Sequence, residues 1–150
     1  MSTHTGWSRR GFLAASVAVV AGGVCGCGER GPEHVAWGTD SCAFCGSPIS
    51  DPRFAAQVRG PKNQVWKFDD CGCAIKFLAG KPWGEDPAAE IWVGNSTLRE
   101  GGGAAWLDGR TAGFVPGIAS PQGYDYGAVP RKVEGALDFK AFRAALLEKS

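Results

Sequence analysis

The run Phe54-Ala-Ala-Gln-Val-Arg-Gly-Pro-Lys-Asn-Gln-Val-Trp-Lys-Phe-Asp-Asp-Cys-Gly-Cys-Ala-Ile-Lys-Phe-Leu78 predicts two strands and a helix in direct succession. Residues 54–58 and 63–68 are rich in the aromatic and branched side chains that strands favour. The segment Arg59-Gly60-Pro61-Lys62 between them has turn residues, so the two strands are expected to form a hairpin.

A helix is expected to follow this hairpin at once. Asp69 or Asp70 can serve as its N-cap, and apolar residues continue through Leu78. Gly80, followed by Pro82, is a typical helix end. This places the pair of cysteines at 71 and 73 in the first helical turn or in the turn that leads into it.

The rest of the chain predicts fewer elements. A third strand is expected at 90–93, and a weaker one at 105–108 or 113–115. Residues 139–147 have helical spacing of apolar side chains, with Asp138 as the N-cap. The predicted fold class is therefore α+β: a small single domain with a ββαβ-like unit, an antiparallel sheet and a C-terminal helix.

The first thirty residues predict export. Ser8-Arg9-Arg10-Gly11-Phe12-Leu13 is a twin-arginine pattern, and a short apolar run follows it. Val24-Cys25-Gly26-Cys27 resembles a bacterial lipobox, in which Cys27 becomes the first residue and carries a lipid. An uncleaved N-terminal anchor and cleavage without lipid are the alternatives.

These features divide the chain into three parts. Residues 1–26 are expected to be the twin-arginine lipoprotein signal, 27–40 a lipidated tether, and 41–150 the metal-binding domain. The protein would be anchored to a membrane by its lipid and face the periplasm or the outer cell surface. His34, the histidine of the tether, is a further candidate metal ligand.

Composition excludes several classes of function. The 150 residues contain 16 Lys and Arg against 15 Asp and Glu, a net charge of +1, so nucleic acid is not expected as a partner. The sequence contains no Ser–His–Asp arrangement, no phosphate-binding glycine loop and no histidine-rich zinc-hydrolase motif. We therefore expect a binding protein and not an enzyme.

The cysteines carry the chemistry. Four remain after the signal and the lipidated residue, at Cys42, Cys45, Cys71 and Cys73. They are compatible with a disulfide framework, which export allows, with a structural zinc site, or with Cu(I), which soft thiolates select. A thioredoxin-like redox role fits less well, because Pro48 and Pro52 follow where that motif should enter a helix.

Two stretches resemble the NosL family, copper lipoproteins associated with assembly of nitrous-oxide reductase. The stretches are Cys42-Ala-Phe-Cys-Gly-Ser-Pro-Ile-Ser-Asp-Pro-Arg-Phe-Ala-Ala-Gln57 and Phe68-Asp-Asp-Cys-Gly-Cys73. The resemblance implies a compact α+β fold. It also implies a periplasm-facing carrier that holds Cu(I) and passes it to a copper enzyme or a copper transporter.

This sequence departs from the family pattern at the methionines. Ser47 stands where the family has Met after Cys-Gly, Gln122 stands in the late Pro-Met-Gly loop, and the only Met is the initiator. Cys71 is an additional thiol. We therefore expect a divergent member with a site made only of thiolates, from Cys42, Cys45, Cys71 and Cys73. Zinc is the second choice of metal, and a structural lipoprotein stabilised by disulfides or zinc is the alternative function.

Overall fold

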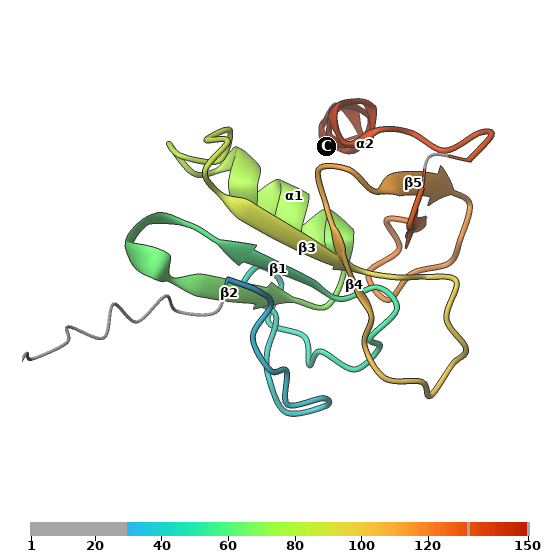
Figure 1. The fold of residues 1–150 in the computed structure, drawn as a ribbon, viewed down its shortest axis with the longest axis horizontal. Helices are drawn as coiled ribbons and strands as arrows, with labels where there is room; N and C mark the ends of the chain where they lie inside the picture. The colour runs from blue at the N-terminus through green and yellow to red at the C-terminus, as the bar shows by residue number, and fades with distance from the viewer. Residues whose placement is uncertain (1–29, 132, 150) are drawn as a thin grey trace, which may run out of the picture. The chain divides into compact units, whose positions relative to one another are not determined.

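The computed structural model describes residues 30–131 and 133–149, and the folded unit begins at Gly31. The twin-arginine signal and Cys27 lie outside the described residues. In chain order the elements are β1 (Ala56–Arg59), a 3-10 turn (Pro61–Asn63), β2 (Val65–Phe68), α1 (Cys71–Ala79), β3 (Glu90–Gly94), β4 (Trp106–Asp108), β5 (Gly113–Pro116), β6 (Tyr126–Val129) and α2 (Phe139–Glu148) (Figure 1).

The four-stranded sheet has the order β2-β1-β3-β4, and all its neighbouring strands are antiparallel. Its register pairs Val58 with Trp66 on one side and with Ile91 on the other. Directly opposed residues share a face, so these apolar side chains form one surface. Helix α1 lies against this surface (Figure 1). The predicted hairpin and the helix that follows it are confirmed.

Helix α1 begins where its cap predicts. Asp70 has extended backbone angles, and its side chain accepts a hydrogen bond from the backbone N–H of Gly72. Gly80 is the C-cap, as expected from the sequence. Seven of the nine helical residues are buried, including the first three, so the start of α1 is a core feature of the fold.

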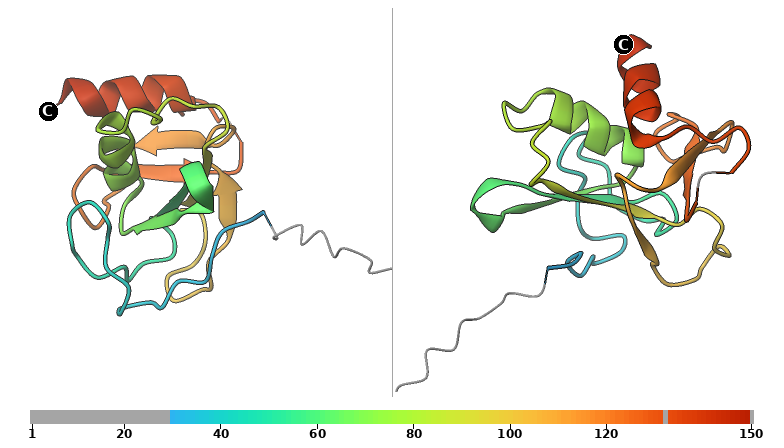
Figure 2. Two further views of the ribbon diagram at one scale, coloured as in Figure 1. Left: turned by 90° about the vertical axis from the view of Figure 1, so that its left-hand side faces the viewer. Right: turned by 45° about the horizontal axis from the view of Figure 1, so that its top comes forward.

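A second, two-stranded sheet pairs β5 with β6, and α2 packs beside it (Figure 2). The Phe142 ring of α2 stacks on Phe114 at 4.0 Å between ring centroids and meets the edge of Tyr126 at 5.0 Å. Both weak candidate strands formed, as β4 and β5, while β6 was not expected, because Tyr126-Gly-Ala-Val129 is short and contains a glycine. The α+β class with a C-terminal helix is confirmed.

The segment 31–40 lies against the other face of the four-stranded sheet. Buried Gln57 of β1 binds the backbone of Glu33 twice, accepting from its N–H at 2.8 Å and donating to its carbonyl at 2.7 Å. Val35 is buried with the core. Residues 31–40 of the expected tether therefore belong to the folded unit. The buried side-chain amide of Gln57 is satisfied by hydrogen bonds to the backbone of this segment. None of the described helices is long and apolar enough to cross a membrane.

The aromatic cluster around α2 gives a matched test of the fold. Phe142→Ala should lower the free energy of unfolding by about 3–5 kcal/mol, because it empties a fully buried ring site. Phe44→Ala, at a side chain that is 47% exposed, should change it by less than about 1 kcal/mol. Urea unfolding followed by circular dichroism measures both values. Equal losses in the two variants would contradict this packing.

Candidate metal centre

The Cys-x-x-Cys segment forms a closed loop. Ser41 and Pro48 form an isolated β-bridge, the N–H of Cys42 donates to the carbonyl of Ser47, and the N–H of Gly46 donates to the carbonyl of Cys42. Gly46 has a φ of 79°, a left-handed conformation that glycine adopts without strain. The two cysteine side chains are therefore held on one tight turn.

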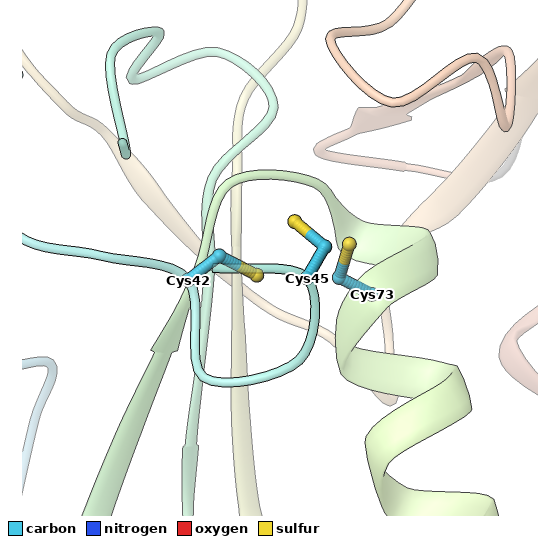
Figure 3. Close-up of side chains that lie close together, drawn as sticks. All are labelled: Cys42, Cys45 and Cys73. Atoms are coloured by element: carbon cyan, nitrogen blue, oxygen red, sulfur yellow. The ribbon is translucent and has the colours of Figure 1, made fainter. Parts of the chain in front are cut away.

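A backbone hydrogen bond attaches this loop to the sheet. The N–H of Ala43 donates to the carbonyl of Lys67 in β2, at 2.9 Å. Three residues after Lys67 the chain reaches the cap of α1, so the loop lies beside the first turn of that helix. Cys73 projects from this turn toward the loop (Figure 3).

The structure brings three of the four predicted cysteines together. The sulfurs of Cys42, Cys45 and Cys73 all lie within 4.8 Å of one another (Figure 3). Cys42 and Cys73 are buried, whereas Cys45 is exposed. Three thiols at this separation can converge on one soft ion from two elements that are far apart in the sequence.

The two buried thiols differ in acidity. The pKa of Cys42 lies well below its usual range, because the Cys73 thiol donates a hydrogen bond to its sulfur and backbone N–H groups at 44, 45 and 69 add to this. The pKa of Cys73 is raised by the same hydrogen bond, by burial and by the nearby negative sulfurs. This hydrogen bond therefore favours the thiolate form of Cys42 and the neutral form of Cys73.

Cys71 lies outside the cluster, so the predicted four-sulfur site is corrected to three sulfurs. Its thiol approaches the carbonyl oxygen of Tyr126 at 3.9 Å, on the far side of the helix from Cys73. Residues two apart in a helix point in nearly opposite directions. Burial, followed by the charge of Asp70, raises the pKa of Cys71 well above its usual range, so this thiol stays neutral.

His34 is also outside the cluster. Its side chain is exposed, and its backbone carbonyl accepts a hydrogen bond from the ammonium of Lys67 at 2.6 Å. That ammonium also pairs with Asp40 at 2.8 Å. In the described residues the predicted histidine ligand thus serves the packing of segment 31–40 and does not join the thiol cluster.

The loop of residues 120–124 closes over the start of α1. The sequence predicts no structural role for this loop and shows only that it lacks a methionine. The backbone N–H of Gln122 donates to Asp70 at 3.2 Å, and its side-chain amide donates to Asp69 at 2.8 Å. Tyr124 lies on Gly72 so closely that an added Cβ would be 2.3 Å from its ring. Burial raises the pKa of Tyr124 to about 12.

The signal for this closure is present in the sequence as two adjacent acids before a Cys-Gly-Cys run. Both carboxylates are buried, and buried carboxylates need donors. Asp70 has its cap donor, while Asp69 needs partners from elsewhere. Which segment supplies them could not be inferred without the fold.

The comparisons with known proteins support the fold. No protein-family model matches this sequence, and no curated protein matches it. The solved crystal structure of the copper chaperone NosL from Shewanella denitrificans is similar, with a TM-score of 0.52 and 20% sequence identity. The similarity covers 76% of this chain and 87% of that one. At this identity it shows a NosL-like fold.

The donor set also fits a soft metal ion. Three thiols within reach of one ion, one of them with a lowered pKa, can bind a thiophilic metal such as Cu(I) or zinc.

The contact between Gly72 and Tyr124 predicts a reversal of the usual glycine rule. Alanine in place of a helical glycine normally stabilises by about 1 kcal/mol. Gly72→Ala should instead destabilise by about 1–3 kcal/mol, because its Cβ would displace the Tyr124 ring. Gly80→Ala, whose Cβ meets nothing closer than 3.6 Å, should stay within about 0.5 kcal/mol. Urea denaturation compares them, and a stabilised Gly72→Ala variant would refute the contact.

The difference in exposure predicts an order of thiol modification. Among the four cysteines that the structure describes, brief treatment of the reduced, metal-free protein with iodoacetamide should label Cys45 first, because Cys42, Cys71 and Cys73 are buried. Peptide mapping by mass spectrometry assigns each label. Labelling of Cys71 as fast as Cys45 would contradict the arrangement of the helix.

Proposed function

We propose that this protein is a lipid-anchored, extracytoplasmic carrier of Cu(I) and not an enzyme. The observation that supports this most is the convergence of three sulfurs within 4.8 Å, from a loop and a helix. The solved structure with a similar fold is a copper chaperone. The twin-arginine pattern and the lipobox-like segment of the sequence support export and attachment through Cys27.

The exposure of the sulfurs suggests how copper would leave. Cys42 and Cys73 are buried and would keep the ion, whereas exposed Cys45 is the ligand that an acceptor can reach. An incoming soft ligand of the acceptor would bond to Cu(I) as the bond to Cys45 breaks, and Cys45 would then take up a proton. The charge of the ion does not change in this exchange.

The acceptor follows from the sequence resemblance. A copper enzyme such as nitrous-oxide reductase, or a copper transporter, is the partner that a NosL-type carrier would serve. Thiolates hold Cu(I) more tightly than thioethers do, and the absence of methionine beyond the initiator leaves thiolates as the sulfur ligands. We therefore propose slow release to a strong acceptor.

A second candidate function uses the same sulfurs in another way. Thiols this close can oxidise to a disulfide, which would make the protein a stapled structural lipoprotein of the envelope. Zinc, with a fourth ligand from water or a partner, would serve the same role. The state of the thiols in protein purified without oxygen separates these functions from copper binding.

A Cu(I) titration tests the carrier directly. The mature protein in detergent should bind one Cu(I) and develop near-ultraviolet thiolate-to-copper absorbance. Cys42→Ser, Cys45→Ser and Cys73→Ser should each weaken binding by more than about 100-fold, beyond the usual effect of losing an outer contact. Competition with a chromogenic Cu(I) chelator gives the affinities.

Cys71→Ala is the matched control, because Cys71 is a cysteine of the same helical turn that lies outside the cluster. It should bind Cu(I) with the affinity of the unchanged protein. Equal binding by all four variants, or a Cys42–Cys45 disulfide in anaerobic protein, would refute the proposal.

A further inference from the structure

The face of the four-stranded sheet opposite α1 carries two half-buried tryptophans, Trp92 and Trp106. The register pairs Gln57 of β1 with Trp92 of β3. It also pairs Gly94 of β3 with Trp106 of β4. Directly opposed residues share a face, and so do alternate residues of one strand. Both indole rings therefore lie on the side where Gln57 binds the backbone of Glu33, away from α1.

Segment 31–40 adds a third tryptophan to this face. The Trp37 ring stacks on Trp106, with 6.4 Å between the ring centroids and an angle of 18° between the planes. Trp37 is 37% exposed. Two hydrogen bonds between Ala36 and Asp40 close the turn that carries it. The surface formed by Trp37, Trp92 and Trp106, named here the tryptophan face, thus presents an exposed ring from a fixed turn.

Two ion pairs lie on the tryptophan face. Arg59 pairs with Glu90 at 3.3 Å, and its guanidinium carbon lies 5.5 Å from the centroid of the Trp92 ring. Lys67 pairs with Asp40 at 2.8 Å. The four charges of these pairs offset one another. Aromatic surface, and not an excess of one charge, is therefore what this face offers to a partner.

The chain limits how far the tryptophan face can lie from a membrane. Cys27, the lipidated residue of the proposed function, precedes Gly31, where the folded unit begins, by four residues. Four residues span at most about 14 Å when fully extended. The carbonyl of Gly31 accepts a hydrogen bond from Arg59 at 2.8 Å, so the chain joins the sheet on its tryptophan side. A lipid on Cys27 would therefore hold this side next to the bilayer surface.

We infer that the tryptophan face rests on the interfacial region of the phospholipid bilayer in which Cys27 is anchored, with Trp37 as the inserted ring. Tryptophan favours this region, because its ring is large and apolar while its indole N–H can donate to a headgroup or to water. The inference rests on the lipid anchor of the proposed function, and it does not require copper.

This contact would orient the metal site. Helix α1, from which Cys73 projects, packs on the opposite face of the sheet (Figure 1). Lipid on the tryptophan face would therefore leave α1 on the side turned away from the bilayer. The exposed Cys45 sulfur lies beside the first turn of this helix, where an acceptor protein can approach it.

The test uses the full lipidated, metal-free protein in phosphatidylcholine vesicles, in which brominated phosphatidylcholine quenches nearby indole rings. The unchanged protein should lose part of its tryptophan fluorescence. Trp37→Ser should lower the quenched intensity at least about threefold, because it removes the inserted ring. Trp37→Phe, which keeps a ring on Trp106, should also lower it, because the emission of Trp37 is lost.

The matched control is Trp83→Phe. Trp83 is also half-buried and stacks on another tryptophan, Trp66, with 5.2 Å between ring centroids, but on the α1 side of the sheet. Its replacement should leave the quenched intensity unchanged. Urea unfolding checks that each variant keeps the fold. An equal effect of Trp37→Ser and Trp83→Phe would overturn the inference.

A second lipid composition separates aromatic contact from charge. Glu33 and Asp108 are exposed acids near the tryptophan face, so added phosphatidylglycerol should not increase the quenching. Quenching that appears only with this anionic lipid would mean contact through charge, and it would also overturn the inference.

Flotation of the vesicles and mass spectrometry of the N-terminal peptide test the anchor separately. Protein that floats with the vesicles but shows no quenching retains its anchor and refutes the contact of the tryptophan face. Protein that does not float and carries no lipid on Cys27 refutes both. A Cu(I) titration of the same samples reports on the carrier function independently of either result.

Discussion

The buried carboxylate of Asp70 is the point on which the arrangement of the site depends. It accepts hydrogen bonds from the N–H of Gly72 at 2.8 Å and from the N–H of Gln122 at 3.2 Å, so it fixes both the start of α1 and the late loop. Asp69 beside it accepts from the Gln122 side chain and, at 3.4 Å, from the N–H of Ser50. A buried carboxylate is costly without such donors, so few arrangements of these segments satisfy both acids. Burial nevertheless raises the pKa of Asp70.

The same constraint gathers acidic groups at the thiols. The pKa of Cys42 is lowered by a hydrogen bond from the Cys73 thiol, and the pKa of Cys73 is raised by the same bond. A bound cation would take the place of the proton that the Cys73 thiol shares in this bond. The loop that presents Cys42 cannot easily move away, since the hydrogen bond between Ala43 and Lys67 attaches it to the sheet. The fold thus holds the thiols close even without a metal.

Much of this could be inferred from the sequence because the determining signals are local. The turn at 59–62, the Asp70 cap and the Cys42–Cys45 spacing each depend on a few neighbouring residues, and the structure has all three. Cys71 lies outside the cluster because residues 71 and 73 both belong to the first turn of α1, where side chains two residues apart point in nearly opposite directions. Strand β6, the packing of segment 31–40 and the closure by Gln122 are long-range pairings. Polar partners such as Gln57 with Glu33 are separated by 24 residues and leave no periodic signal.

Gln122 stands where the resemblance to the NosL family predicts a methionine, and it lies beside the acidic groups of the site. Its carboxamide is turned to Asp69, where it neutralises no charge but satisfies a buried oxygen. Three thiolates around Cu(I) would have a net charge of about −2, which a buried site tolerates only with donors or cations close by. Tyr124 can supply a donor on the side of Cys73. In the proposed exchange, exposed Cys45 would take up a proton as its bond to Cu(I) breaks. This would lower the negative charge of the site by one, so the electrostatic cost of holding three thiolates together favours release of the ion at Cys45.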